Sequence, residues 1–174
     1  MIKYLSDLGV MYMIKSNQIL DEKDKRLRKK SIDVTFPLED KYKKFIDECH
    51  KRGMAVILDI VLNHATGIHP YAKLWWNSSA SKTSTQNPYF NVDAPHPYSV
   101  FHDFNHTYAG TKDMFKRMMQ YWITEYKVDG YRLDLTKGLT QTSSTEATAS
   151  NYDQSRIDNI AEYYNAAKAV KSDV

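Results

Sequence analysis

Residues 128–138 read VDGYRLDLTKG, and the rest of the chain is organised around this stretch. Its side chains alternate with a period of two, so Arg132 and Asp134 share one face. Tyr131 and Leu133 lie on the opposite face. The pattern predicts a short strand. An arginine and an aspartate on one strand face are either a mutually paired structural couple or part of a site, because a buried charge is costly unless it is paired. This stretch alone leaves both interpretations open.

A second stretch, residues 54–64 (MAVILDIVLNH), favours a site. It is an apolar run of strand length, as expected for a strand that is covered on both faces. Asp59 lies inside the run, and Asn63 and His64 lie at its end. Parallel α/β proteins place their chemistry at the carboxyl ends of strands, where these polar residues stand.

The two stretches resemble a known family. Residues 59–64 (DIVLNH) and 130–138 (GYRLDLTKG) are similar to the first two sequence signatures of the alpha-amylase family of glycoside hydrolases, and residues 102–106 (HDFNH) are similar to a weaker third. The resemblance covers about residues 1–14 and 40–174. It implies an α/β fold: a partial (β/α)8 TIM barrel, about the second to fourth strand-helix units, with a long inserted subdomain after the third barrel strand. A closed barrel takes about 250 residues, whereas this chain has 174.

The hydrophobic pattern predicts where the elements lie. We expect helices over residues 2–8, 38–52, 111–126 and 155–170, and strands over residues 10–14, 54–62 and 128–135. In the second helix the apolar face is Tyr42, Phe45, Ile46 and Cys49, and Gly53 ends it. In the last helix we expect Ile157, Ile160, Tyr164 and Ala167 to face inward. The predicted organisation is one incomplete catalytic domain, with barrel segments at 1–64 and 111–174 and a loop-rich subdomain at 65–110.

The resemblance also implies roles for single residues. Asp134 corresponds to the catalytic nucleophile, and Arg132 would keep it ionised and oriented. Asp59 would pair with Arg132 or support the floor of the site. His64 corresponds to a histidine that hydrogen-bonds the sugar, and Lys137 to a residue on the leaving-group side. The histidine that usually follows that lysine is Gly138 here.

A calcium ion is the one cofactor that the resemblance implies. Asn63 and Asp103 match positions that hold structural calcium in many relatives, and oxygen ligands suit calcium. Two side chains alone do not define such a site.

One essential group has no counterpart in these residues. Retaining glycoside hydrolysis needs a nucleophile and a general acid about 5–5.5 Å apart. In the family the acid is a glutamate on the fifth strand, which the matched region does not reach. We therefore expect this chain alone to be inactive, with Glu146 as the substitute acid if it does turn over.

Composition excludes several classes. The 174 residues are 42% hydrophobic and 26% charged with a net charge of +3, as in an ordinary globular protein. No apolar run approaches the roughly 20 residues of a membrane span, and the first ten residues contain no signal core. Residues 23–30 (KDKRLRKK) are strongly basic, but no aromatic residue interleaves with the cations, so we expect a solvated loop and no nucleic-acid partner. The single cysteine, Cys49, excludes an internal disulfide.

Three functional hypotheses remain. The first is a fragment of a retaining alpha-glucan hydrolase that acts on starch-like glucans or malto-oligosaccharides. The second is a non-catalytic remnant that binds glucan weakly. The third is a metal-dependent hydrolase, because five histidines fall within residues 64–106. We also expect self-association through exposed sheet edges.

Overall fold

The computed structural model describes residues 38–98 and 100–174. The predicted helix at 2–8, the predicted strand at 10–14 and the basic run at 23–30 lie outside the described residues. The chain divides into two compact units, residues 1–56 with 126–128, and residues 57–125 with 129–174. Each unit is described by itself below.

In the first unit, helix α1 (Leu38–His50) confirms the predicted helix. Phe45, Ile46 and Cys49 are buried, as their spacing predicts. The helix begins with acidic residues and ends with a histidine, which suits the helix dipole. Gly53 follows in the left-handed conformation with φ 69°, which is the conformation that glycine adopts most easily after a helix.

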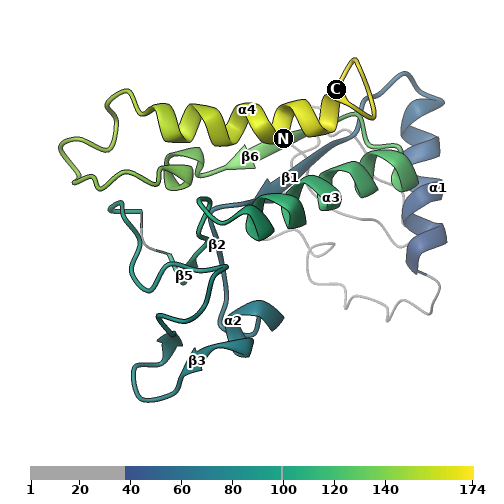
Figure 1. Ribbon diagram of the computed structural model, residues 1–174. Coiled ribbons are helices and arrows are strands. Elements are labelled where there is room, and N and C mark those ends of the chain that lie inside the picture. The colour runs from purple at the N-terminus through teal and green to yellow at the C-terminus, as the bar shows by residue number, and fades with distance from the viewer. Residues whose placement is uncertain (1–37, 99) are drawn as a thin grey trace, which may run out of the picture. The chain divides into compact units, whose positions relative to one another are not determined.

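The second unit contains the parallel strand pair on which the candidate site stands. Strand β1 (Ile57–Val61) pairs with strand β6 (Gly130–Asp134), and the two lie side by side in Figure 1. Both predicted strands are therefore confirmed, although each is shorter than the predicted ranges of 54–62 and 128–135. One expectation is wrong: β1 is not covered on both faces. Ile57 and Val61 are 46% and 42% exposed, because their face of the strand pair has no covering layer among the described residues.

Two helices cover the other face of β6. Tyr131 and Leu133 of β6 line a hollow together with residues of α3 (Ala109–Tyr126) and α4 (Gln154–Lys168). The two helices are joined by Glu162, which accepts from Lys112 at 2.7 Å and from Lys116 at 2.9 Å. These contacts tie the helices that precede and follow β6 to each other.

Helix α4 is confirmed in position, but its predicted inward face is wrong in part. Ala167 is buried as expected, whereas Ile157 and Tyr164 are 42% and 47% exposed. Asn159 and Tyr163 are buried in their place. The reason is hydrogen bonding: each of these polar side chains has a buried partner, so the face that carries them can turn inward.

Residues 65–110 form short irregular elements with an aromatic core. Strand β2 (His64–Ala65) pairs antiparallel with β5 (His102–Asp103), and β3 (Trp76–Asn77) pairs with β4 (Lys82–Thr83). Helix α2 (Pro70–Leu74) lies between β2 and β3. Stacked rings fill the interior, with centroids 4.3 Å apart for Phe90 and Phe104. The boundaries of this segment as a subdomain stay a prediction.

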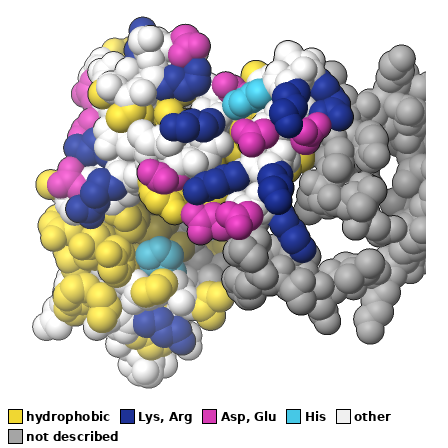
Figure 2. Space-filling view, turned by 90° about the vertical axis from the view of Figure 1, so that its right-hand side faces the viewer, with side chains coloured by type: hydrophobic (Ala, Val, Ile, Leu, Met, Phe, Trp, Pro, Cys, Tyr) yellow, Lys and Arg dark blue, Asp and Glu magenta, His cyan; other side chains and the backbone are white. Residues whose placement is uncertain are grey.

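Several large apolar side chains of this segment are exposed: Ile68, Leu74, Val100, Phe101 and Tyr108. On the face drawn in Figure 2, charged side chains of both signs alternate, and hydrophobic side chains gather lower down. Among the described helices, none is long and apolar enough to cross a membrane.

The uncovered face of the strand pair generates a prediction about association. We expect the isolated chain to self-associate as its concentration rises, because Ile57 and Val61 are exposed apolar side chains on the strand pair, and among the described residues neither β1 nor β6 pairs with a further strand. Replacing both, Ile57→Thr with Val61→Thr, should lower the mean mass measured by light scattering while keeping β-branched side chains in the strand.

Ile68→Thr is the matched control, since Ile68 is 81% exposed but lies outside the strand pair. A concentration-independent monomer for the unmodified chain would contradict the prediction.

Candidate active site

The centre of the candidate site is an ion-pair group on the open face of the strand pair. The parallel register sets Asp59 opposite Arg132 and Val61 opposite Asp134. Arg132 and Asp134 are two residues apart and therefore point the same way. Arg132 Nη1 donates to Asp59 Oδ1 at 2.9 Å and to Asp134 Oδ1 at 2.6 Å. The structure thus brings together the three charged residues that the sequence analysis singled out.

This group is open to solvent. The side chains of Arg132, Asp59 and Asp134 are 57%, 65% and 42% exposed. The hydrogen bond to Asp59, and to a smaller extent the one to Asp134, raise the pKa of the Arg132 guanidinium above its ordinary value. Solvent-exposed ion pairs add little to stability, so folding alone gives a weak reason for three charges at this place. An accessible carboxylate on a rigid strand is what an attack on a substrate requires.

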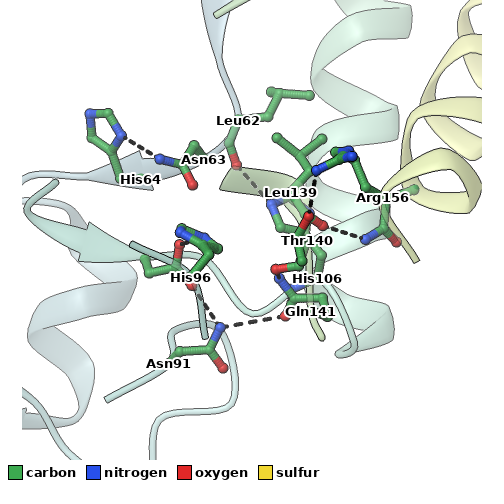
Figure 3. Close-up of polar contacts among 12 residues, drawn as sticks. Leu62, Asn63, His64, Asn91, His96, His106, Leu139, Thr140, Gln141 and Arg156 are labelled. Atoms are coloured by element: carbon green, nitrogen blue, oxygen red, sulfur yellow. Dashed lines mark hydrogen bonds and ion pairs between the residues drawn. The ribbon is translucent and has the colours of Figure 1, made fainter. Parts of the chain in front are cut away.

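Asn63 and His64 follow β1 after one residue, Leu62. Asn63 is fully buried, and its amide contacts His64 Nδ1 at 3.1 Å (Figure 3). His64 opens β2, where it is paired with Asp103 of β5. The His64 imidazole also lies against the Phe101 ring, with centroids 5.8 Å apart.

The Asn63 amide can take either of two orientations. With its oxygen inward, Oδ1 faces two further oxygens, Asp103 Oδ1 at 3.2 Å and the Gly138 carbonyl at 2.8 Å. With its nitrogen inward, the amide donates to both of these oxygens, and its own oxygen accepts from His64 Nδ1. The second orientation satisfies the cluster by hydrogen bonds within the protein.

With the Asn63 oxygen inward, the oxygen atoms of the cluster are of the kind that binds calcium. It presents three oxygens at separations that suit neighbouring ligands of one ion held at 2.3–2.6 Å. Asp103 is 4% exposed, and its Oδ2 accepts from Asn91 at 2.7 Å. Its Oδ1 lies 3.1 Å from His96 Nε2, which makes no hydrogen bond. Calcium takes six to eight oxygens, so three protein oxygens are a partial set.

Steric contact with Asn63 explains why residue 138 is a glycine in this chain. A Cβ built on Gly138 would overlap the Asn63 amide. The resemblance leads one to expect a histidine here, and in this chain the Asn63 side chain occupies the space that such a side chain would need. The backbone carbonyl of residue 138 remains directed at the Asn63–Asp103 cluster.

Lys137 lies on the short 3₁₀ helix η3 (Thr136–Leu139) and does not join the ion-pair group. Its ammonium donates to Ser150 Oγ at 2.8 Å and lies 5.7 Å from the centroid of the Tyr98 ring. Leu135, between Asp134 and this helix, adopts φ 48°. The left-handed conformation of Leu135 ends the extended backbone of β6, and Lys137 follows in the 3₁₀ helix.

His106, which the sequence analysis counted among the histidines of a possible metal site, supports the end of β1. His106 is 1% exposed. Its Nε2 bonds the Leu62 carbonyl at 2.9 Å (Figure 3). Its Nδ1 bonds Tyr163 Oη at 2.6 Å. The network therefore ties the residue before Asn63 to helix α4. The five histidines within residues 64–106 suggested a metal site from the sequence, and their spacing alone could not reveal this packing role of His106.

Two other histidines of residues 64–106 also pack against neighbouring residues of the chain. His69 accepts from the Tyr71 amide at the start of α2, and His102 lies edge-on to Trp76. Burial lowers the pKa of both imidazoles. Within residues 38–98 and 100–174, no group of three or more His, Cys, Asp or Glu side chains could hold a metal ion. The metal-dependent hydrolase hypothesis gains no support from this part of the chain.

Comparison with known proteins identifies relatives of this chain. The family model described as alpha amylase, catalytic domain, matches residues 2–108, which is more than half of the chain. The malto-oligosyltrehalose trehalohydrolase of Saccharolobus solfataricus is 34% identical over 106 residues, and the cyclomaltodextrinase of a Bacillus species is 29% identical over 153 residues. These matches cover 59% and 77% of this chain, but only 16% and 27% of the relatives.

Among solved structures, Eubacterium rectale Amy13B is similar with a TM-score of 0.55 and 23% identity. The match covers 77% of this chain and 29% of that one. At this identity the likeness concerns the fold alone. The chain thus spans less than a third of the length of each of these three proteins.

The His106 network predicts a pH dependence of stability. Burial lowers the pKa of His106 from 6.5 to about 4. Between pH 6.5 and pH 4 this imidazole is therefore protonated in the unfolded chain and neutral in the folded chain. Stability is therefore complete above pH 6.5 and is lost as the pH falls toward 4. The loss between pH 7.5 and 4.5 should be about 2–3 kcal/mol, measured by urea unfolding at both pH values.

His106→Gln can keep both hydrogen bonds without titrating, so it should lose less stability on acidification than the unmodified chain. The exposed His50, as His50→Gln, is the control. Equal acid sensitivity of the unmodified chain and His106→Gln would contradict the assignment.

Proposed function

The chain belongs to the alpha-amylase family of glycoside hydrolases, and on that premise we propose that it carries the nucleophile and part of the sugar-binding surface of a retaining alpha-glucan hydrolase. One observation supports this most directly. Asp59, Arg132 and Asp134 form a solvent-open ion-pair group on the sequence signatures that the family resemblance singled out.

Asp134 is the proposed nucleophile. Its Oδ1 accepts from Arg132, and this hydrogen bond leaves Oδ2 to approach an anomeric carbon. In the proposed step, Oδ2 bonds to that carbon while the bond to the leaving sugar oxygen breaks, and the leaving oxygen takes a proton from a general acid. Arg132 is a positioning residue, because its guanidinium fixes the carboxylate through one of its two oxygens. Asp59 fixes the guanidinium in turn.

The proposed substrates are starch-like alpha-glucans and malto-oligosaccharides. His64 and Lys137 are the proposed sugar contacts, with Asp59 at the floor of the site. The proposed scaffold is an incomplete (β/α)8 barrel in which β1 and β6 are the third and fourth strands and residues 65–110 are an inserted subdomain. The fold likeness to Amy13B agrees with this assignment.

The alternative is a glucan-binding chain without turnover. Within the ion-pair group, both carboxylates accept hydrogen bonds from the same guanidinium nitrogen, so neither is arranged to donate a proton. The resemblance places the general acid on a fifth strand, beyond the matched residues. General acid catalysis contributes about 10²–10⁴-fold, so we expect this chain alone to release no measurable reducing sugar from starch.

A substrate that needs no general acid separates the two functions. Fluoride leaves from α-maltosyl fluoride with its electron pair and without a proton. Asp134 should therefore displace it and form a maltosyl ester, which water then hydrolyses. We expect fluoride release, or a maltosyl adduct in the intact mass of the protein, in the unmodified chain.

Asp134→Asn should abolish both signals, and Asp158→Asn, a carboxylate of α4 outside the ion-pair group, should not. Absence of fluoride release and of any adduct in the unmodified chain would support the binding function instead. Fluoride release that survives in Asp134→Asn would show that another group is the nucleophile.

Calcium is the proposed structural ion of the Asn63–Asp103 cluster, with the Gly138 carbonyl as a third protein oxygen. An ion that binds only the folded chain stabilises it by about 2.7 kcal/mol at a hundred times its Kd. We therefore expect calcium to raise the Tm by several degrees over the Tm in a chelator. Asp103→Asn, which keeps the side-chain shape but removes the charge, should remove most of that increase.

Equal Tm values with calcium and with chelator would show that the Asn63 amide has its nitrogen inward and that the cluster needs no ion. Magnesium at the same concentration is the control for ionic strength.

A further inference from the structure

The segment that leads into β5 places an aromatic ring against each of the two proposed sugar contacts. Phe101 lies against the His64 imidazole, with ring centroids 5.8 Å apart and planes at 41°. Three residues earlier, the Tyr98 ring lies 5.7 Å from the Lys137 ammonium. His64 and Lys137 come from different strand ends, so one short segment contacts both sides of the proposed sugar-binding surface.

Phe101 is poorly explained by folding. It is 68% exposed, so its ring gains little from burial. Its φ is 53°, in the left-handed region that costs energy for a bulky residue and that glycine would occupy freely. The register of β2 and β5 sets His102 opposite Ala65, which leaves Phe101 just before the pairing begins. Folding therefore does not explain why residue 101 is a phenylalanine. Its position beside a proposed sugar contact suggests a role in binding.

We propose that Phe101 is a stacking platform for a glucosyl unit of the substrate, next to the unit that His64 contacts. This inference rests on the proposed function and adds to it a specific binding residue. The faces of a glucose ring carry C–H groups, which pack well on an aromatic ring while the hydroxyl groups at the ring edge remain free for polar partners. The His64 imidazole beside the phenyl ring supplies such a partner. The exposed Val100 extends the apolar surface.

The test is the affinity for maltotetraose, measured by titration calorimetry or by NMR. We expect Phe101→Ala to weaken binding roughly tenfold, as the loss of one stacking contact and its buried area would. Phe101→Trp should bind as tightly as the unmodified chain or more tightly. Tyr152→Ala is the matched control, because Tyr152 is an aromatic residue that is 77% exposed elsewhere in the chain.

Phe101→Gly separates binding from folding. Glycine relieves the positive φ and removes the ring, so this variant should lose affinity while its Tm stays equal or rises. A fall of affinity together with a large fall of Tm in both Phe101→Gly and Phe101→Ala would mean that the ring supports the fold, and would overturn the proposal.

His64→Ala distinguishes this inference from the function on which it rests. If His64→Ala weakens binding and Phe101→Ala does not, the proposal that Phe101 stacks on a glucosyl unit is wrong and the proposed function stands. If the unmodified chain does not bind maltotetraose at all, both are overturned.

Discussion

The parallel register between β1 and β6 is the constraint on which the candidate site depends. It sets Asp59 beside Arg132, and the alternation along β6 puts Asp134 on the same face. One guanidinium nitrogen can then hold both carboxylates. A slip of the pairing by one residue would turn the whole set to the opposite face. The apolar side chains on the covered face of β6, Tyr131 and Leu133, fix the register, because they must meet α3 and α4.

The chain stabilises the site from the residues beside it. The ion-pair group itself is exposed and adds little. Immediately after β1, however, the buried Leu62 carbonyl accepts a hydrogen bond from His106, which also bonds Tyr163 of α4, and the buried Asn63 side chain contacts His64. Buried polar groups are costly when they lose a partner. This cost holds the end of β1 in one conformation, and the exposed carboxylates are therefore held by neighbours that do not take part in the chemistry.

The sequence predicted the parts of this arrangement that depend on local periodicity. The period of two in residues 130–134 and the spacing in α1 determine which side chains share a face, and both predictions are confirmed. The prediction for α4 was wrong where it took Ile157 and Tyr164 as buried, because Asn159 and Tyr163 find buried partners that lie about twenty or more residues away in the chain. The packing role of His106 was not predicted for the same reason. Its role depends on Leu62 and Tyr163, and no local pattern connects the three.

Among the described residues of the second unit, three non-glycine residues have positive φ: Ser81, Phe101 and Leu135. Two of them lie beside residues proposed to act, since Leu135 follows Asp134 and the Phe101 ring lies against His64. Strain of this kind persists where the surrounding structure fixes the backbone, and it marks functional sites more often than chance would. In this chain the surrounding structure is the hydrogen-bonded end of β1 and the β2–β5 pair. Leu135 stands between Asp134, which belongs to the ion-pair group, and Lys137, which bonds Ser150 instead. The positive φ at Leu135 ends the alternation that places Arg132 and Asp134 on one face, and Lys137, beyond it, therefore takes its partners from other segments of the chain.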